Sequence, residues 1–425
     1  MNILLLGSGG RECAISWKLS QSPLCSQLFI APGNAGTSAY GKNVSLSLTD
    51  FDGIKKHCID YKIDILFPGG EDTLVAGIYD FFKHDAELKH IIVVGPSKNG
   101  AQLEGSKAFS KKFMQRHQIP TAAYAEFNND NFDEGIIYIK KHTLPIVLKA
   151  DGLAAGKGVV IAQSTDEALE VFTEMIKNAQ FGDASKTVVI EQFLDGIECS
   201  VFAMTDGSNY VLLPEAKDYK RIGEGDKGPN TGGMGAISPV PFADEAFMLK
   251  VITQVVEPTV KGLELENIVY HGFIFFGLIK VNNEPHVIEY NCRMGDPETE
   301  VVMPRLQNDL VELIVKMNTH KLNEVQVKHD QRAACAVMLV SEGYPGNYPK
   351  GRVMSGFEKT KDSLLFHAGT SVKDGDIVTS GGRVIAIASY GDSIQGALAK
   401  SYENAALIDY EGKYYRKDIG WEFTP

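Results

Sequence analysis

The segment NILLLGSGGRE, residues 2–12, decides the fold of the first part of the chain. Its apolar run followed by a glycine-rich turn predicts a buried strand, a tight turn and a helix from about Arg11 to Ser20. Pro23 prevents that helix from continuing. The same order returns in QLFIAPGNAG (27–36), DILFPGGE (64–71) and HIIVVGPS (90–97). Strands that alternate with helices favour an α/β parallel sheet, which binds ligands at the glycine-rich ends of its strands.

The rest of the chain has an α+β pattern. Apolar runs typical of strands lie at 145–150, 158–162, 187–194, 198–206, 210–216, 272–281 and 286–291. Ser164 and Glu167 have the spacing of a capping box and predict the start of a helix between two of these strands. The predicted apolar face of that helix holds Ala168, Leu169, Phe172, Met175 and Ile176. The tail from about Gln331 is again β-rich, with a helix near 393–408.

Length and composition exclude several classes of protein. The 425 residues predict two to four domains, and 44% hydrophobic with 23% charged residues is typical of globular chains. A formal charge of −12 argues against a broad nucleic-acid surface, although it allows a local cationic cleft. None of the six cysteines forms a C-x-x-C pair, and no apolar run approaches the ~20 residues that cross a bilayer. The run ILLL is too short for a signal peptide, so we expect a soluble cytoplasmic protein.

The turn GSGGRE, residues 7–12, only begins the dinucleotide fingerprint. Glu12 stands where the third glycine belongs, and no acidic residue follows the second strand to hold a ribose. What is left is a glycine turn at a helix N-terminus, which favours anions in general. The alternative is a turn that serves packing alone.

The hairpin KADGLAAGKGVVIA, residues 149–162, resembles a Walker A loop but fails its spacing. Three residues separate Gly152 from Gly156, and Gly158 replaces the Ser or Thr that should follow Lys157. A glycine-rich hairpin that closes over phosphates, with Lys149 and Lys157 supplying charge, is one interpretation, and a flexible surface hairpin is the other.

Two further segments could hold a nucleotide or an anion. In VVIEQFLDGIE (188–198), main-chain groups could meet a purine edge and Glu198 a ribose, although solvated carboxylates are the simpler interpretation. The segment from Asp218 to Ser238 is predicted to be a long polar loop. Its glycines let backbone N–H groups approach an anion, and a disordered linker is the alternative.

The most informative segment is HVIEYNCRMGDPETE, residues 286–300. Glu289, Asn291 and Arg293 alternate in it with Ile288, Tyr290 and Cys292. Residues i and i+2 of a strand share a face roughly 6.5 Å apart, so Glu289 and Asn291 should point together, away from the apolar set. Two such oxygen ligands with phosphate and water suit Mg²⁺. Arg293 could bind phosphate oxygens in fork geometry.

Taken together and in order, these motifs resemble the glycinamide ribonucleotide synthetases, or phosphoribosylamine–glycine ligases, of the ATP-grasp superfamily. The resemblance runs from residue 1 to about 421. It rests on GSGGRE (7–12), APGNAGT (31–37), QLEGSKAF (102–109), KADGLAAGKGV (149–159), GPNTGGMGA (228–236), IEYNCRMGDPETE (288–300) and DIGW (418–421).

The resemblance implies an ATP-grasp fold with an N-terminal Rossmann-like parallel sheet and a C-terminal β-rich domain. The expected parts are a substrate-binding domain (1–103), a linking helix (104–121), a small ATP-grasp lobe with a flap hairpin (122–194), a large ATP-grasp lobe with the metal site (195–328) and the β-rich domain (329–425).

It also implies a reaction of de novo purine biosynthesis. ATP phosphorylates the carboxylate of glycine, and the amine of 5-phosphoribosylamine attacks the glycyl phosphate to give glycinamide ribonucleotide, ADP and phosphate. The implied cofactors are ATP as co-substrate and Mg²⁺ or Mn²⁺. The implied partners are these small molecules, without nucleic acid or membrane. We expect a monomer, with a homodimer as the alternative.

The resemblance assigns the site residue by residue. The catalytic residues are Arg293, Lys149 and Asp218. ATP is expected at Lys107, Lys149, Gly156, Lys157, Gly158, Glu191, Phe193, Leu194 and Glu198, with 156–158 as the flap. The substrates are expected at Gly9, Gly10, Asn34, Ala35, Gly36, Thr37, Glu71, Asp218, Lys220, Gly295, Asp296 and Glu298. The metal ligands are Glu289 and Asn291.

Some positions depart from the family pattern. Cys13 and Tyr219 each stand where a His is common, and Asp72 follows Glu71 where Ala is usual. Gly277 stands where many ATP-grasp enzymes have a second metal carboxylate, which leaves the ligands of a second metal unassigned.

Three other functions compete with the ligase. The first is another ATP-grasp ligase of purine biosynthesis that uses bicarbonate or formate. The second is a non-catalytic nucleotide-sensing module, against which the trio of Glu289, Asn291 and Arg293 argues. The third is a dehydrogenase, which the incomplete fingerprint disfavours.

Overall fold

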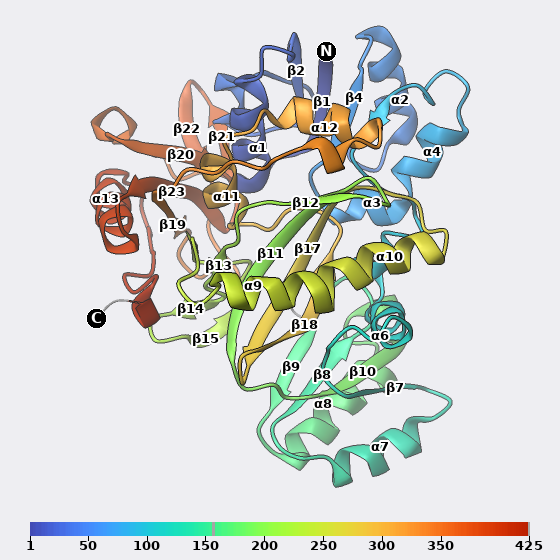
Figure 1. The fold of residues 1–425 in the computed structure, drawn as a ribbon. Coiled ribbons are helices and arrows are strands. Elements are labelled where there is room, and N and C mark those ends of the chain that lie inside the picture. Colours follow the sequence, from blue (N-terminus) through green and yellow to red (C-terminus); the bar gives the residue numbers. More distant parts are fainter. Residues whose placement is uncertain (155–157, 424–425) are drawn as a thin grey trace.

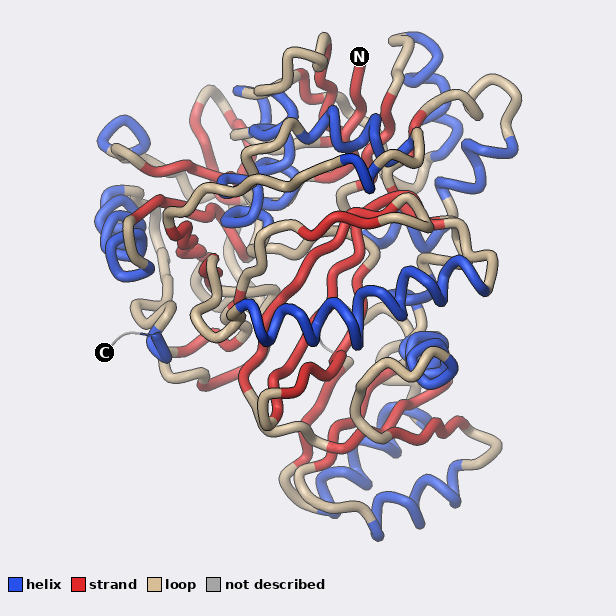
Figure 2. Tube along the Cα trace, in the orientation of Figure 1, coloured by secondary structure: helices blue, strands red, loops and turns tan. Residues whose placement is uncertain are grey.

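A computed structural model describes residues 1–154 and 158–423 of the chain (Figure 1). Gly156 and Lys157 of the expected flap lie outside the described residues. Figure 2 shows the strands gathered in the middle of the molecule with helices mostly around them. Within the described part of the chain, no helix has both the length and the apolar character needed to cross a membrane.

The N-terminal part is a parallel sheet of five strands in the order β3-β2-β1-β4-β5. The strands are β1 (Asn2–Gly7), β2 (Gln27–Pro32), β3 (Lys42–Asn43), β4 (Ile65–Pro68) and β5 (Ile92–Val93). The helices are α1 (Gly10–Ser20), α2 (Phe51–Asp60), α3 (Glu71–Ala76) and α4 (Ile78–His84). The predicted strand, turn and helix of residues 2–20 are confirmed.

The continuous apolar run of β1 is explained by burial on both faces of this sheet. Ile3 and Leu5 pack with α1 in one hydrophobic cluster, whereas Leu4 and Leu6 pack with α2 in another. The strand order reverses direction between β1 and β4. The loops that follow these two strands therefore meet at a topological switch point, where open α/β sheets bind ligands.

A four-stranded antiparallel sheet follows, in the order β7-β10-β8-β9. Its strands are β7 (Tyr124–Asn128), β8 (Ile146–Ala150), β9 (Val159–Ala162) and β10 (Thr187–Gln192), and its helices are α7 (Phe132–Lys141) and α8 (Thr165–Lys177). The Oγ of Ser164 accepts the N–H of Glu167 at the start of α8, as the capping-box spacing predicted. Ala168, Phe172 and Met175 bury the expected apolar face.

The segment between these two sheets holds two helices rather than one. They are α5 (Gln102–Gly105) and α6 (Lys107–Arg116). Extended backbone at Ser106 separates them, and its Oγ caps α6 by accepting the N–H of Phe109.

A second antiparallel sheet has the order β12-β11-β17-β18. It consists of β11 (Ile197–Thr205), β12 (Tyr210–Leu212), β17 (Tyr270–Val281) and β18 (Glu284–Asn291), and β6 (Gly95–Pro96) pairs with β17 from the N-terminal part. A long helical segment lies across it (Figure 1). That segment is made of α9 (Glu245–Val251), a π-helical stretch (Ile252–Val256) and α10 (Glu257–Leu265).

The C-terminal sheet has the order β13-β16-β19-β23-β20. It contains β13 (Lys217–Asp218), β16 (Gly235–Ser238), β19 (Ala333–Val340), β20 (Ser363–His367) and β23 (Arg383–Gly391), beside helix α13 (Ile394–Leu407) and the hairpin of β21 (Thr370–Lys373) and β22 (Asp376–Thr379). Helices α11 (Thr299–Arg305) and α12 (Leu310–Asn318) connect it to the second sheet.

The prediction of one long polar loop from Asp218 to Ser238 is wrong. Besides β13 and β16, this segment forms the hairpin of β14 (Arg221–Gly223) and β15 (Lys227–Asn230). On one side β16 pairs with β13, and on the other side it pairs with β19, which lies about a hundred residues further along the chain. A pattern read along the chain does not contain that pairing.

His367 on β20 makes the stability of the fold depend on pH, and its carbonyl oxygen accepts a hydrogen bond from Asn34 in an N-terminal loop. Its ring is buried, stacks on Phe357 and meets Thr370 Oγ1 at 3.0 Å. Burial lowers the pKa of His367 to about 4, whereas an unfolded His titrates near 6.5. Between these two pH values the imidazole is protonated in the unfolded chain and neutral in the folded chain. The free energy of unfolding therefore falls by on the order of 3 kcal/mol as the pH drops from about 6.5 to about 4.

We expect His367→Gln to remove this part of the acid sensitivity. The difference in urea unfolding midpoint between pH 7 and pH 4 should be smaller in the variant than in the unaltered chain, because glutamine does not titrate. Equal pH dependence of the two proteins would contradict the buried neutral imidazole.

Candidate active site

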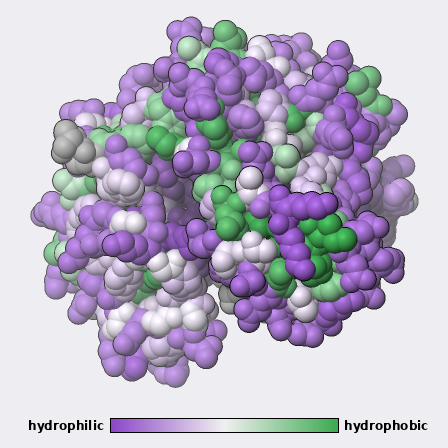
Figure 3. Space-filling view, turned by 90° about the horizontal axis from the view of Figure 1, so that it is seen from below, coloured by the Kyte–Doolittle hydropathy of each residue, from purple (hydrophilic) through white to green (hydrophobic). Residues whose placement is uncertain are grey.

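A cleft of about 1040 Å³ lies where the four-stranded sheet, the second sheet and the loops of the N-terminal part face one another. Seen from below, the surface is mostly hydrophilic and is divided by a groove (Figure 3). Most of the expected site residues line the cleft together. They are Glu71, Lys107, Lys149, Gly158, Glu191, Phe193, Leu194, Glu198, Asp218, Lys220, Glu289, Asn291, Arg293, Asp296 and Glu298.

A buried carboxylate with two ammonium groups forms one wall. Glu191 on β10 binds Lys149 on the neighbouring strand β8 at 3.0 Å and Lys111 on α6 at 3.1 Å. Lys149 also donates to the carbonyl oxygen of Ile288 at 3.3 Å, which joins this wall to β18. The other oxygen of Glu191, Oε1, is buried and has no hydrogen-bond partner among the described residues.

Lys111 is a residue that sequence reasoning missed. It lies one helical turn after Lys107 on α6, and its side chain is 2% exposed. Burial lowers its pKa to about 8, although Glu191 opposes the shift. The i, i+4 spacing from Lys107 was the available signal, because it puts both side chains on one face of a helix.

Lys107, the first residue of α6, also lines the cleft. Its Nζ donates to the carbonyl oxygen of Gly152 at 3.2 Å. Burial lowers the pKa of Lys107, and the carboxylate of Glu289 opposes that change. The ammonium group of Lys107 is therefore close enough to Glu289 for the two charges to interact.

The candidate metal strand β18 contains a bulge. Gly277 pairs with Glu289 and Leu278 with Val287, so Ile288 is an extra residue. The expectation that Ile288 shares a face with Tyr290 and Cys292 is therefore wrong. Val287 takes that place in the hydrophobic core. Glu289 and Asn291, which follow the bulge, both line the cleft.

Gly277 leaves room for Glu289. A Cβ at this position would lie 3.0 Å from the Cγ of Glu289, the residue opposite it in the ladder. Many ATP-grasp enzymes have a carboxylate where this chain has Gly277, and such a side chain would compete with Glu289 for space here.

Glu289 and Asn291 can supply two oxygen ligands to one divalent ion. Within residues 1–154 and 158–423, no group of three or more His, Cys, Asp or Glu side chains is arranged to hold a metal. A hard ion that takes two protein oxygens and completes its shell with phosphate and water fits this donor set better than a protein-only cage does.

Arg293 is held between two carboxylates. Its Nε contacts Glu71 at 3.1 Å, its Nη2 contacts Glu104 at 2.7 Å, and its Nη1 donates to the carbonyl oxygen of Met294 at 3.3 Å. Burial opposes ionisation of Glu71, yet Arg293 and Arg11 lower its pKa to about 2. Glu71 was expected beside a ribose, and its observed partner is a guanidinium.

Acidic side chains gather beside Lys220. This lysine pairs with Glu198 at 2.7 Å, and Ser200 donates to the Oε1 of Glu298 at 2.9 Å. Burial, with the charge of Asp218 added, raises the pKa of Glu298 to about 7. Burial also raises the pKa of Asp218. Glu298 is buried and Asp218 is partly buried, and a cationic group between two such neighbouring carboxyl groups would favour their ionised forms.

The glycine turn after β1 differs from the anion site expected there. The N–H of Gly9 donates to the Oε2 of Glu12 at 2.6 Å, and the Glu12 side chain is buried. A Cβ on Gly69 would lie 2.4 Å from the Oε1 of Glu12, so glycine there makes room for it. The chain's own carboxylate therefore occupies part of the site, because Glu12 lies at the third position of α1 and reaches back to the cap.

The loop after β2 is tied to this turn. Asn34 accepts the N–H groups of Gly36 and Thr37 and donates to the carbonyl oxygens of Ser8 and His367. These loop residues, like Gly9, Gly10, Ala35 and Gly295, are not among those that line the large cleft.

Arg383 on β23 is a second residue that sequence reasoning missed. Its Nη1 contacts the Oδ1 of Asp296 at 3.1 Å, and it lines the cleft from the C-terminal sheet. Although burial opposes it, Arg383 and Arg11 hold the pKa of Asp296 below its usual value. The apolar strand around Arg383 gave no signal of this role.

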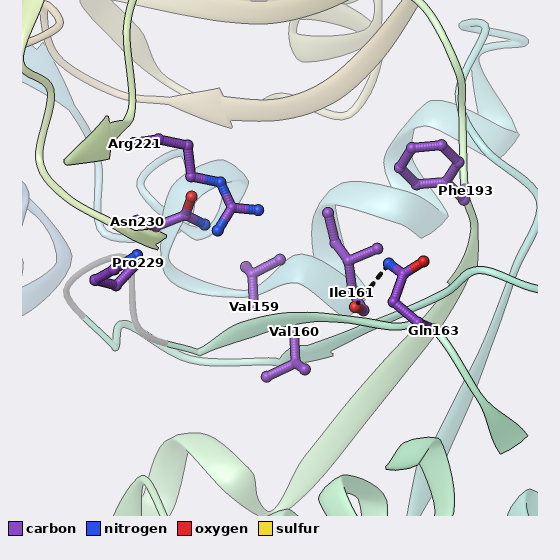
Figure 4. A pocket seen from close by; sticks show the side chains of 8 residues that line it. All are labelled: Val159, Val160, Ile161, Gln163, Phe193, Arg221, Pro229 and Asn230. Atoms are coloured by element: carbon purple, nitrogen blue, oxygen red, sulfur yellow. Dashed lines mark hydrogen bonds between the residues drawn. The ribbon is translucent and has the colours of Figure 1, made fainter. Parts of the chain in front are cut away.

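A smaller cavity of about 540 Å³ opens beside the cleft (Figure 4). It lies between β9, the segment after β10 and the β14–β15 hairpin. Its lining residues are Val159, Val160, Ile161, Gln163, Phe193, Arg221, Pro229 and Asn230. Phe193 lines both the cavity and the cleft, and so do Arg221 and Asn230 of the β14–β15 hairpin. The hairpin therefore lies beside the part of the cleft where the nucleotide is expected.

Family models cover nearly the whole chain. The N domain of phosphoribosylglycinamide synthetase matches residues 1–104, its ATP-grasp domain 105–299 and its C domain 334–422. The chain belongs to the phosphoribosylglycinamide synthetase family. Two curated relatives agree, the phosphoribosylamine–glycine ligases of Haemophilus influenzae, 46% identical, and Vibrio vulnificus, 45% identical, each aligned over 99% of this chain and 98% of theirs.

Solved structures agree with the phosphoribosylglycinamide synthetase assignment. The phosphoribosylamine–glycine ligase of Thermotoga maritima has a TM-score of 0.85 and 35% identity, over 98% of this chain and 100% of that one. A biotin carboxylase domain from Hydrogenobacter thermophilus, 16% identical with a TM-score of 0.72 over 97% of this chain and 91% of that one, shares the fold alone. The expected ATP-grasp fold, with its N-terminal parallel sheet and β-rich end, is confirmed. The family model that matches residues 105–299 is an ATP-grasp domain, and the Hydrogenobacter thermophilus domain was solved with ADP and magnesium.

Proposed function

We propose that this chain is an ATP-dependent ligase that joins glycine to 5-phosphoribosylamine through a glycyl phosphate. The products are glycinamide ribonucleotide, ADP and phosphate, a step of de novo purine biosynthesis. Full-length similarity to phosphoribosylamine–glycine ligases supports the reaction. The observation that carries the proposal is a single cleft lined by Lys107 and Lys149, by Glu289 and Asn291 of β18, and by Arg293.

Phosphoryl transfer to glycine needs positioning and charge neutralisation more than covalent chemistry. In our proposal Lys107 and Lys149 bind the ATP phosphates from one wall. Glu289 and Asn291 hold Mg²⁺ or Mn²⁺ on the other, and the ion supplies further neutralising charge. Arg293 binds the acyl phosphate, because a guanidinium matches phosphate oxygens in fork geometry.

The nucleotide base and sugar are assigned to the lysine wall and its continuation. Glu191, Phe193 and Leu194 form the adenine edge, and the unpartnered Oε1 of Glu191 suits the amino group of adenine. Glu198 takes the ribose hydroxyls, which requires it to share or exchange its contact with Lys220. The flap at 156–158 stays a proposal from the sequence.

Glycine and phosphoribosylamine are assigned to the acidic and N-terminal sides. Asp218 with Glu298 binds the ammonium group of glycine, beside Lys220, Gly295 and Asp296. The phosphate of phosphoribosylamine binds at the loops of Gly9, Gly10 and residues 34–37, with Glu71 near its ribose. Glu12 already accepts the N–H of Gly9, so the proposal depends on the remaining N–H groups of these loops.

An assay of ADP release tests the reaction. We expect ADP to form with ATP, glycine and phosphoribosylamine together, and not when either acceptor is omitted. ADP release with bicarbonate or formate and another ribonucleotide, but not with glycine, would replace this proposal by the related ligase. ATP binding without any ADP release would favour a sensing module. NAD binding would favour a dehydrogenase.

A further inference from the structure

Glu104 is a buried acidic residue that the proposed reaction does not use. It lies on α5, in the QLEGSK segment just before Lys107, and its side chain is 6% exposed. Its Oε1 contacts the Nη2 of Arg293 at 2.7 Å. Its Oε2 accepts the N–H of Cys292 at 2.8 Å and the S–H of Cys292 at 3.1 Å. Glu104 therefore binds both the side chain of Arg293 and the backbone of the preceding residue.

The two carboxylates at Arg293 differ in how firmly they are held. Glu71, at the Nε edge, has a side chain that is 30% exposed, whereas Glu104 makes contacts with both of its oxygens inside the protein. Solvent and a ligand can therefore compete for Glu71 more easily than for Glu104. The buried carboxylate fixes one edge of the guanidinium and leaves the other edge exchangeable.

Burial of this ion pair has an energetic cost. Burial raises the pKa of Glu104, and the charge of Arg293 opposes that shift. A buried ion pair of this kind is often no more stabilising than apolar side chains of the same volume, because both charges lose their hydration. What the pair provides is orientation, since the Nη2 contact with Glu104 and the Nη1 contact with the carbonyl oxygen of Met294 restrain the guanidinium even when the Nε edge exchanges its partner.

We propose that Glu104 is the positioning residue that aims Arg293 at the transferred phosphoryl group. This inference rests on the proposed function, in which Arg293 binds the acyl phosphate. Glu104 acts through Arg293 and needs no contact with substrate. Since a misplacement of about 1 Å in a reacting geometry can cost about 10²-fold in rate, loss of this contact should lower turnover without weakening nucleotide binding.

Glu104→Gln tests the proposal because it keeps the shape of the side chain and removes its charge. We expect kcat for glycine-dependent ADP release to fall about 10- to 100-fold. The KM for ATP should change by no more than about two-fold, because within residues 1–154 and 158–423 no ion pair or side-chain hydrogen bond joins Glu104 to Lys107, Lys149 or Glu191. Glu266→Gln is the matched control. It removes a carboxylate that binds Arg116 and His117, and it should leave kcat unchanged.

A double-mutant cycle separates positioning from a general structural role. Combined with Arg293→Ala, Glu104→Gln should lower kcat by no more than about two-fold further, because the side chain it positions is gone. The same fold loss in both backgrounds would overturn the proposal, as would an unchanged kcat in the single variant.

Chemical labelling gives a readout that does not need ligase activity. Arg293 should react faster with phenylglyoxal in Glu104→Gln than in the unaltered chain, measured by mass spectrometry of the peptide that contains it, and Glu266→Gln should not differ. Equal labelling rates would overturn the positioning role. Absence of glycine-dependent ADP release in the unaltered chain would instead refute the proposed function, while the labelling would still report on Glu104.

Discussion

Arg293→Ala is expected to lower kcat by about 10³-fold while ATP binds nearly as well as before. Removing one preorganised donor from a developing charge typically costs about 10²- to 10³-fold in rate, and a guanidinium carries a full charge. The proposed nucleotide side of the cleft consists of Lys107, Lys149 and Glu191, whereas the partners of Arg293 among the described residues are Glu71, Glu104 and Met294. Steady-state ADP release and calorimetric binding of a non-hydrolysable ATP analogue measure the two quantities separately.

A surface arginine supplies the control for this variant. Arg116 also binds a carboxylate, Glu266, but on an exposed part of α6, so Arg116→Ala should keep full turnover. Arg293→Ala leaves Glu71 and Glu104 without their shared cation, and its thermal midpoint should be measured so that unfolding is not mistaken for lost catalysis. A stable Arg293→Ala protein with turnover within about ten-fold of normal would contradict the role of Arg293 in the reaction.

Local sequence patterns predicted the elements whose causes are local. The apolar run and glycine turn of residues 2–10 fix β1 and the start of α1, and the hydroxyl of Ser164 fixes the start of α8. Glu289 and Asn291 both line the cleft, as their spacing predicted, although a bulge at Ile288 changed which apolar residues face the core. The bulge precedes both ligand candidates, so their i, i+2 relation is unchanged.

The parts that the sequence did not predict depend on contacts between distant segments. Arg383, the first residue of β23, contacts Asp296, which lies 87 residues earlier in the loop between β18 and α11. In the sequence Glu12 stood out only as the residue in place of a third glycine, and its carboxylate is enclosed by Gly7 and Gly9 of one loop and Gly69 of another. The contact of Glu12 with Gly9 is local, but the approach of Gly69 and the pairing of Arg383 with Asp296 leave no pattern in the sequence, because these partners are far apart along the chain.

Glu104 illustrates the same limit within a recognised motif. The QLEGSK segment (102–107) was expected to bind ATP through Lys107, which lies three residues after Glu104. The role of Glu104 became visible only when β18 brought Cys292 and Arg293 to it. One short motif can thus contain residues with two proposed roles. Lys107 would bind the nucleotide, and Glu104 would orient Arg293.

Glu289→Ala is the second variant with a large expected effect. It removes the only carboxylate of the proposed metal pair and leaves Asn291 as a neutral ligand. We expect kcat to fall by about 10²- to 10³-fold at a fixed Mg²⁺ concentration, because charge neutralisation at the phosphates is then incomplete. The Mg²⁺ concentration for half-maximal activity should rise as well, and Mg²⁺ titration of ADP release measures both effects.

Glu284→Gln is the matched control for Glu289→Ala, because Glu284 begins the same strand but pairs with Lys250 outside the cleft. Its Mg²⁺ titration should match that of the unaltered chain. This control is needed because the charge of Glu289 also acts on Lys107, so loss of the carboxylate changes the charge balance in the cleft as well. If the variant lost turnover with an unchanged Mg²⁺ requirement, Glu289 would act on Lys107 rather than as a metal ligand. A shifted Mg²⁺ requirement with ATP binding retained separates the metal role from that electrostatic one.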